Sequence, residues 1–187
     1  IITSGEGGIA ITNNKQIADK IRKIKNYGRA KKGVYEHESL GFNFKFNDMC
    51  ASIGLAQISK LKSFINKKKI INNYYRKAFK NVSQISFSES IKNSNPVYWF
   101  VVIYINNKEK LRHYLKMKGI ETRDMFLPMN MQKCFKNSNS IINVKGKFEN
   151  SFELYKTGLC LPSSVNLNSK KLHYITSAIK KFYENRG

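Results

Sequence analysis

The chain has 187 residues, of which 41% are hydrophobic and 12% aromatic. This is enough for one sizeable domain or parts of two, and too apolar for an intrinsically disordered protein. The net charge of +22 indicates either a solvated basic surface or a field that attracts an anionic substrate. No apolar run approaches the roughly 18 residues of a membrane-spanning helix, so no membrane span is predicted.

The three cysteines, Cys50, Cys134 and Cys160, are far apart in the sequence. Their spacing fits neither a zinc site nor a disulfide framework, and no metal site is predicted. Free thiols in a reducing compartment are the simplest interpretation, which favours a cytoplasmic protein. Ile1 is not an initiator methionine, so we expect further residues before it.

The first 28 residues combine a glycine turn, a strand and a helix. Three glycines lie within residues 4–8, and the apolar run at 7–12 is typical of a short buried strand. Asn13 or Asn14 can cap a helix whose isoleucines recur at spacings of four and three, at Ile17, Ile21 and Ile24. Gly28 can end this helix with a positive φ.

Residues 29–45 form a long connection without a helix or strand pattern. Such connections are uncommon unless they are functional or disordered, and several aromatic side chains argue against disorder. We therefore expect an ordered loop that docks against another surface, such as a second subunit. Asn47 or Asp48 can then cap a helix of up to eight turns, long enough to bridge two domains.

The remaining residues alternate between strands and helices. The pattern after residue 80 is β-β-α-β-α-β-α, which predicts a small α/β domain. Its strongest strand is 97–105, expected to be buried on both faces, with Trp99 in the core. The other expected elements are strands at 85–88 and 159–161, an extended segment at 120–126, and helices starting near residues 106, 148 and 168.

The glycine-rich residues 4–8 are the first candidate for chemistry. Such a backbone can pass close to a flat ligand or present N–H groups to an anion. An ordinary turn before a strand explains the same residues, and both interpretations stay open at this point.

The order and spacing of several segments resemble a known family. Residues 1–12 resemble the stretch directly after the Schiff-base lysine of the DegT/DnrJ/EryC1/StrS family of pyridoxal-phosphate-dependent nucleotide-sugar aminotransferases. Residues 40–45 are similar to that family's Gly-aromatic-Asn-aromatic-Arg loop. Further segments resemble the family in the same order, at 51–58, 119–129 and 158–162. The resemblance is strongest to members that act on 4-keto-6-deoxy sugars, such as perosamine synthetases, and to their C-terminal half only.

The resemblance implies an α/β fold of fold type I, like aspartate aminotransferase. Residues 1–62 would be the end of the large cofactor-binding domain, with the crossing loop and the start of a linking helix, and residues 63–187 the small C-terminal α/β domain. The implied reaction moves an amino group from glutamate to C4 of a nucleotide-linked 4-keto-6-deoxyhexose, in surface-polysaccharide or glycan sugar biosynthesis. The implied cofactors are pyridoxal 5'-phosphate and pyridoxamine 5'-phosphate, and the implied assembly is a cytoplasmic homodimer with shared active sites.

The resemblance also assigns site residues. Asn43 would hydrogen-bond the cofactor phosphate of the partner subunit, although a turn asparagine is the simpler alternative. Substrate-binding roles would fall to Tyr35, His37, Lys45 and Arg123. Lys45 stands where the family usually has Arg, and it keeps a positive charge without the bidentate fork. A surface lysine, and a salt bridge of Arg123 with Glu121 or Asp124, are the corresponding alternatives.

No catalytic residue is assigned within these 187 residues, because the family's lysine is expected immediately before Ile1. Either a cofactor-modified lysine splits the chain there or the chain is a fragment. A related dehydratase, in which histidine replaces that lysine, is a second candidate function. A basic nucleic-acid-binding module is a third, and it depends on net charge alone. The predominance of Lys over Arg disfavours it, so no nucleic-acid partner is predicted.

Overall fold

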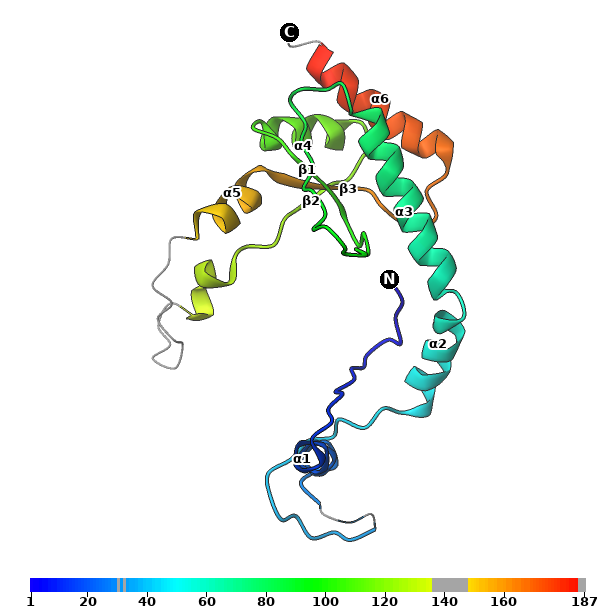
Figure 1. The fold of residues 1–187 in the computed structure, drawn as a ribbon, viewed down its shortest axis with the longest axis vertical. Helices are drawn as coiled ribbons and strands as arrows, with labels where there is room; N and C mark the ends of the chain where they lie inside the picture. The colour runs from blue at the N-terminus through cyan, green and yellow to red at the C-terminus, as the bar shows by residue number, and fades with distance from the viewer. Residues whose placement is uncertain (30, 32, 136–147, 185–187) are drawn as a thin grey trace. The chain divides into compact units, whose positions relative to one another are not determined.

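The computed structural model describes residues 1–29, 31, 33–135 and 148–184. The chain forms two compact units, Ile1–Lys62 and Ser63–Gly187 (Figure 1). The assignment of these units to a large and a small domain stays a prediction. Within the described residues, no helix combines the length and the apolar character that crossing a membrane requires.

The helices of the first unit begin at asparagine caps, as the sequence predicts. In α1 (Lys15–Lys25), Oδ1 of Asn14 accepts a hydrogen bond from the N–H of Ile17 at 3.1 Å. In α2 (Asp48–Ile58), Oδ1 of Asn47 accepts from the N–H of Cys50 at 2.9 Å. Each cap satisfies one of the N–H groups that the first turn of a helix leaves unpaired.

The loop after α1 returns to the end of that helix. The N–H of Phe42 donates to the carbonyl oxygen of Ile24 at 2.8 Å, and the N–H of Phe44 donates to that of Lys25 at 3.1 Å. A Cβ on Gly41 would lie 2.0 Å from the backbone nitrogen of Gly28. The loop is therefore tied to α1 by backbone bonds, and its close approach requires glycine at position 41.

Two expectations for the first unit are wrong. Residues 7–12 form no strand, and the side chains of Ile9 and Ile11 are each 87% exposed. A strand needs a neighbour for its backbone hydrogen bonds, and none of the described residues pairs with this segment.

The prediction of a single long helix from residue 47 or 48 is also wrong, because this segment divides into α2 and α3 (Leu61–Ala78). At the break, the hydroxyl of Ser59 donates to the carbonyl oxygen of Ala56 at 3.0 Å, and the N–H of Lys60 donates to that of Gln57 at 3.0 Å. These three-residue bonds tighten the chain beyond an α-helical turn.

The second unit contains a three-stranded antiparallel sheet in the order β1-β3-β2 (Figure 1). Val101 lies opposite Leu161, and Arg123 lies opposite Cys160. Its further elements, in chain order, are β1 (Val101–Tyr104), α4 (Lys108–Met117), β2 (Arg123–Asp124), the short 3-10 helices η1 (Met129–Met131) and η2 (Lys133–Phe135), α5 (Glu149–Thr157), β3 (Gly158–Leu161) and α6 (Ser169–Glu184).

Side chains of α3, α4 and α6 pack with those of β1 and β3 into one core. Burying these apolar surfaces is the main stabilisation of the unit. The fully buried members from these five elements include Tyr75, Ile103, Leu111, Leu159 and Ile179. The predicted α/β character of this segment is confirmed, since helices and strands alternate as expected.

Two predicted strands of this unit are shorter than expected. Residues 85–88 contribute only a single bridge, between Ser86 and Tyr104. Strand 97–105 reduces to β1, and its side chains alternate between buried and half-buried. The indole of Trp99 is 54% exposed rather than in the core, because it lies before the strand.

Candidate functional site

The glycine-rich segment and the crossing loop line one cavity in the first unit. The cavity has a volume of about 470 Å³. Gly7 and Gly8 come from the first segment, Asn43 and Lys45 come from the loop, and Asn47 and Cys50 come from the start of α2. Two motifs about 35 residues apart in the sequence therefore lie together in the fold.

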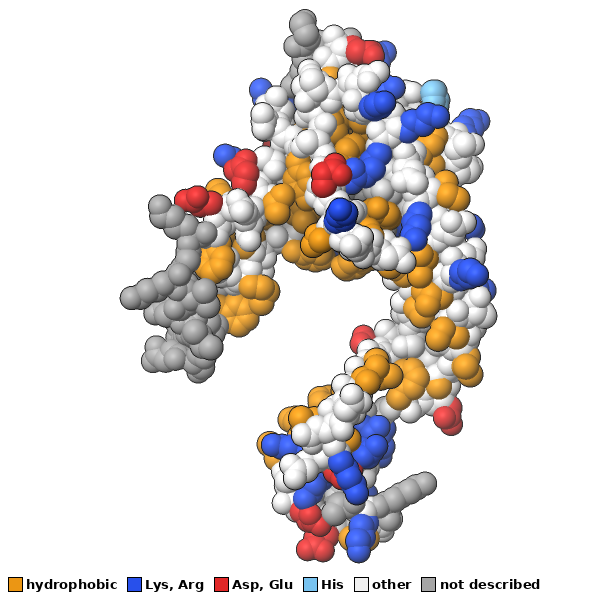
Figure 2. Space-filling view, viewed as in Figure 1, with side chains coloured by type: hydrophobic (Ala, Val, Ile, Leu, Met, Phe, Trp, Pro, Cys, Tyr) orange, Lys and Arg blue, Asp and Glu red, His pale blue; other side chains and the backbone are white. Residues whose placement is uncertain are grey.

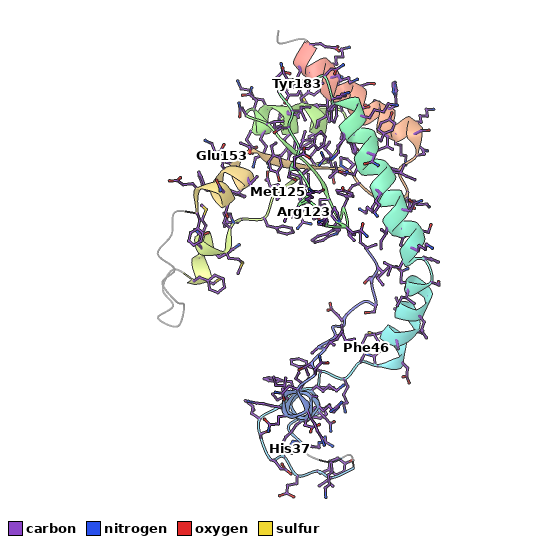
Figure 3. All side chains as sticks on the ribbon, in the orientation of Figure 1. His37, Phe46, Arg123, Met125, Glu153 and Tyr183 are labelled. Atoms are coloured by element: carbon purple, nitrogen blue, oxygen red, sulfur yellow. The ribbon has the colours of Figure 1, made fainter. Side chains whose placement is uncertain are left out.

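At this cavity, Gly7 packs against Phe46. Phe46 lies on the segment that leads into α2 (Figure 3). A Cβ at position 7 would lie 2.7 Å from Cε2 of Phe46 and 3.0 Å from Oγ of Ser4. The backbone has a φ of +153° at this position. Only glycine allows the chain to pass so close to the aromatic ring.

Asn43 lies on a backbone that is fixed by an antiparallel bridge to Asn26, at the end of α1. Its side chain is exposed, and within the described part of the chain its amide forms no hydrogen bond. The amide NH₂ is thus available to donate to an oxygen in the cavity. The N-terminus of α2 borders the same cavity, where the helix dipole favours negative charge.

Lys45 borders this cavity and a second, more basic one of about 990 Å³. Its Nζ lies 4.6 Å from the centroid of the Tyr27 ring, a cation–π distance. Figure 2 shows basic side chains around this part of the first unit. Besides Lys45, the basic side chains that line the second cavity are Lys20, Arg22, Lys23, Lys25, Arg29 and Lys31, and Asp19 is the acidic one.

Tyr35 and His37 lie on the same loop and have different surroundings. The ring of Tyr35 is 82% exposed, and the guanidinium carbon of Arg29 lies 4.9 Å from its centroid. Nδ1 of His37 donates to the carbonyl oxygen of Tyr27 at 2.7 Å, because a carbonyl can only accept (Figure 3). This hydrogen bond holds the His37 part of the loop against the backbone of Tyr27. Nε2 is the second polar atom of the His37 ring.

Sequence reasoning missed Tyr27. Both Lys45 and Arg29 lie at cation–π distance from its ring, with the guanidinium carbon of Arg29 4.9 Å from its centroid. Its φ is +60°, which is uncommon outside glycine. Its place directly before the helix-ending Gly28 is the only signal in the sequence that could have found it.

Arg123 belongs to β2, in the second unit (Figure 3). Its guanidinium carbon lies 5.5 Å from the ring centroid of Phe100 and 5.1 Å from that of Phe126. Asp124 pairs instead with Lys108, at 3.2 Å, and with Arg112. Among the residues that the structure describes, Arg123 forms no ion pair, so the surface salt bridge considered from the sequence is wrong.

The sequence and the fold both match known proteins. The sequence model of the DegT/DnrJ/EryC1/StrS aminotransferase family matches residues 1–180. GDP-perosamine synthase of Escherichia coli O157:H7 is 31% identical over 188 residues, which cover 99% of this chain and 50% of that protein. UDP-4-amino-4,6-dideoxy-N-acetyl-beta-L-altrosamine transaminase of Campylobacter jejuni subsp. jejuni serotype O:2 is 26% identical over 191 residues, covering 98% and 50%.

A solved structure shows the same fold at low sequence identity. Helicobacter pylori PseC, an aminotransferase involved in the biosynthesis of pseudoaminic acid, superposes with a TM-score of 0.78 at 20% identity. The match covers 93% of this chain and 48% of that chain. The chain thus spans about half the length of the curated relatives that it matches. From the family match over residues 1–180, we conclude that the chain belongs to the DegT/DnrJ/EryC1/StrS aminotransferase family.

Proposed function

We propose that the protein is a pyridoxal-phosphate-dependent aminotransferase acting on a nucleotide-linked sugar. The amino group would move from glutamate to C4 of a 4-keto-6-deoxyhexose. Family membership supports the reaction class, and the relatives named for 4-amino-4,6-dideoxy sugars or perosamine support the substrate class. The proposed setting is cytoplasmic synthesis of sugars for surface polysaccharides or other glycans.

The cavity shared by the glycine segment and Asn43 is the observation that carries the proposal. Its donors suit a phosphate group, because the Asn43 amide forms no hydrogen bond within the described part of the chain and the N-terminus of α2 borders the same space. Gly7 keeps the cavity free of a side chain next to Phe46. The lining thus offers an amide donor, the cation Lys45 and a helix N-terminus to the phosphate end of pyridoxal phosphate, with Glu6 as its acidic side chain.

When bound, pyridoxal phosphate supplies an electron sink and carries the amino group between the two substrates. The Asn43 amide would donate to a phosphate oxygen and fix its position without adding charge. Following the family resemblance, we propose that Asn43 serves the cofactor of the partner subunit in a homodimer. Its position on an exposed loop supports such a contact.

The basic cavity beside Lys45 is a proposed site for a phosphate group of the nucleotide sugar. Its seven Lys and Arg side chains attract an anion. Lys45 could contact a phosphate group in either cavity, because it lines both this cavity and the one with Asn43. Tyr35 and His37 are the proposed contacts to the substrate from the same loop, and Arg123 is proposed to bind the diphosphate or the carboxylate of glutamate.

Absorbance and product analysis together test the proposal. The purified protein is expected to gain a visible absorbance band on addition of pyridoxal phosphate and to lose it on reduction with borohydride. With glutamate and a nucleotide-linked 4-keto-6-deoxy sugar, it should release 2-oxoglutarate and an amino sugar. A deoxygenated sugar without an amino group would show a dehydratase instead. Salt-dependent DNA binding without any cofactor band would favour a nucleic-acid-binding module.

A further inference from the structure

The second unit carries an exposed aromatic cluster whose members are Trp99, Phe100 and Phe126. The ring centroids of Trp99 and Phe100 are 4.3 Å apart, and those of Trp99 and Phe126 are 6.0 Å apart. Trp99 is 54% exposed and Phe126 is 56% exposed. Arg123 adds a guanidinium over the rings of Phe100 and Phe126. Within the described residues, large flat apolar surfaces are therefore left uncovered, beside a cation that has no acidic partner there.

Arg123 also stands between two cavities of the second unit. One, of about 310 Å³, is lined by Trp99, Phe100 and the buried Lys68. The other, of about 610 Å³, is lined by Phe126 and by the basic side chains Arg112 and Lys116. An extended ligand could thus place an anionic group at Arg123 and a flat ring on the neighbouring aromatic surface.

Lys68 fixes the backbone that presents Trp99. Its Nζ donates to the carbonyl oxygen of Trp99 at 2.8 Å and to that of Ser163 at 2.6 Å. The hydroxyl of Ser163 donates to the same Trp99 oxygen at 3.3 Å. The Lys68 side chain is only 8% exposed, and burial lowers its pKa. The hydrogen bonds from Lys68 and Ser163 fix the carbonyl oxygen of Trp99 before any ligand arrives, which lowers the ordering cost of binding.

We propose that Trp99, Phe126 and Arg123 form the subsite for the nucleoside phosphate end of the substrate, with Lys68 as a positioning residue. The base stacks on the exposed aromatic surface, and the guanidinium pairs with a phosphate oxygen. This subsite rests on the proposed function in one respect: the nucleoside phosphate that it binds is part of the nucleotide-sugar substrate.

The chemistry of the cluster favours a nucleoside phosphate over the other anionic substrate, glutamate. A carboxylate alone would use the cation but would leave the rings of Trp99 and Phe126 without a ligand contact. Base stacking on an aromatic side chain is sequence-tolerant, because every base has a π-face. Glu121 lines both cavities and disfavours additional anionic groups there, which suits one defined phosphate position better than a general polyanion surface.

Tryptophan fluorescence tests this by comparison of the parent protein with Trp99→Phe, because Trp99 is the only tryptophan of residues 1–187 and any tryptophan outside them is common to both proteins. GMP is expected to quench the fluorescence of the intact protein in a saturable manner, and guanosine is expected to bind much more weakly. Inorganic phosphate should compete with GMP, whereas glutamate should not. The variant Trp99→Phe should lose the part of the quenching that Trp99 contributes but keep most of the GMP affinity in calorimetry, because a phenyl ring still stacks.

Variants separate stacking from charge. Arg123→Gln should weaken both GMP and phosphate binding about tenfold or more, because a charge-assisted hydrogen bond is lost. Trp99→Leu should weaken GMP binding about tenfold and leave phosphate binding unchanged. The matched control is Arg76→Gln, since Arg76 also lies over a phenylalanine ring, 4.8 Å from the centroid of Phe87. It should bind GMP like the parent protein.

Lys68→Met should weaken GMP binding, because the ring of Trp99 is no longer held in position. It should leave phosphate binding nearly intact, because Arg123 is unchanged. Unsaturable quenching, equal GMP affinity of the Arg123→Gln and parent proteins, or competition by glutamate would each overturn the proposal. These binding measurements do not depend on amino transfer. Absence of GMP binding in a protein that still transaminates would refute the subsite alone.

Discussion

Asn43 carries the proposed cofactor contact as a neutral donor. Its NH₂ group can donate to a phosphate oxygen, and it brings no charge that would have to be desolvated when the site is empty. The bridge between Asn26 and Asn43 limits the motion of its backbone. The amide is therefore preorganised for an acceptor that enters the cavity.

Replacing Asn43 tests this contact. Asn43→Ala is expected to weaken pyridoxal phosphate binding about tenfold, as the loss of one hydrogen bond to a charged group implies. Asn43→Asp should bind still more weakly, because a carboxylate repels the phosphate. Titration followed by absorbance gives both affinities. Asn66→Ala, at an exposed position of α3, should leave the affinity unchanged. An Asn43→Ala protein with the parent affinity would remove this residue from the site.

The buried Lys68 is expected to make the free energy of unfolding depend on pH. Burial lowers the pKa of Lys68 below its ordinary value of 10.5. The unfolded chain then binds more protons than the folded one in the interval just below pH 10.5, so the stability of the parent protein rises with pH there. Lys68→Met lacks this rise and removes the ammonium donor from the carbonyl oxygens of Trp99 and Ser163, at a cost of about 1–3 kcal/mol, while the Ser163 hydroxyl still donates to the Trp99 oxygen.

Urea unfolding at neutral pH and at about pH 10 measures the effect. The stability deficit of Lys68→Met relative to the parent should be larger at the higher pH. Lys69→Met is the matched control, because the Nζ of Lys69 bonds to Asn95 at an exposed site. A deficit that shrinks as the pH rises would show that the ammonium is not destabilised by burial.

Among the elements, the crossing loop depends most on backbone contact. Gly41→Ala is expected to destabilise the first unit by roughly 1–3 kcal/mol, because its Cβ would meet the backbone of Gly28 at 2.0 Å, where no side chain can move aside. Gly8→Ala is the control, since a Cβ there meets nothing within 4 Å. Thermal unfolding of the two variants compares them. Equal melting temperatures would mean that the loop is not held against α1 as described.

The elements that the sequence predicted well are those set by local chemistry. The caps Asn14, Asn47 and Asn168 each bond to a backbone N–H three residues ahead, so the starts of α1, α2 and α6 could be identified from a few residues. Strands were predicted less well, because pairing partners are distant in sequence. Residues 7–12 have a strand pattern but no strand neighbour among the described residues.

In the candidate site too, local motifs were predicted well and contacts between distant segments were not. The glycine segment and Asn43 were found from motif spacing and the family resemblance, and they share a cavity. The cation–π contacts of Tyr27 and the buried Lys68 were not predictable, because both depend on the return of a distant segment. Nothing in the local run of three lysines at 67–69 distinguishes the buried Lys68 from the exposed Lys67 and the half-buried Lys69.

At the scale of the whole molecule, the central question is whether the active sites are shared. Within one chain the glycine segment and Asn43 line a common cavity. In the dimer with shared sites that we propose, one protomer would instead supply the glycine segment and its partner would supply Asn43 to the same cofactor. At a pyridoxal phosphate concentration that fills the parent site but not the sites of the variants, mixing Asn43→Asp and Gly7→Val chains should then restore up to about one quarter of the parent activity, because half of the dimers are mixed and each has one intact site. A cavity completed within one protomer would give no restoration.

Transfer of labelled nitrogen tests the proposed function most directly. The intact protein would be incubated with pyridoxal phosphate, a nucleotide-linked 4-keto-6-deoxyhexose and glutamate labelled in its amino group, and the products analysed by mass spectrometry. We expect the label to appear at C4 of the sugar, with an equal amount of 2-oxoglutarate. A sugar product without the label, or no product although the cofactor is bound, would contradict an aminotransferase.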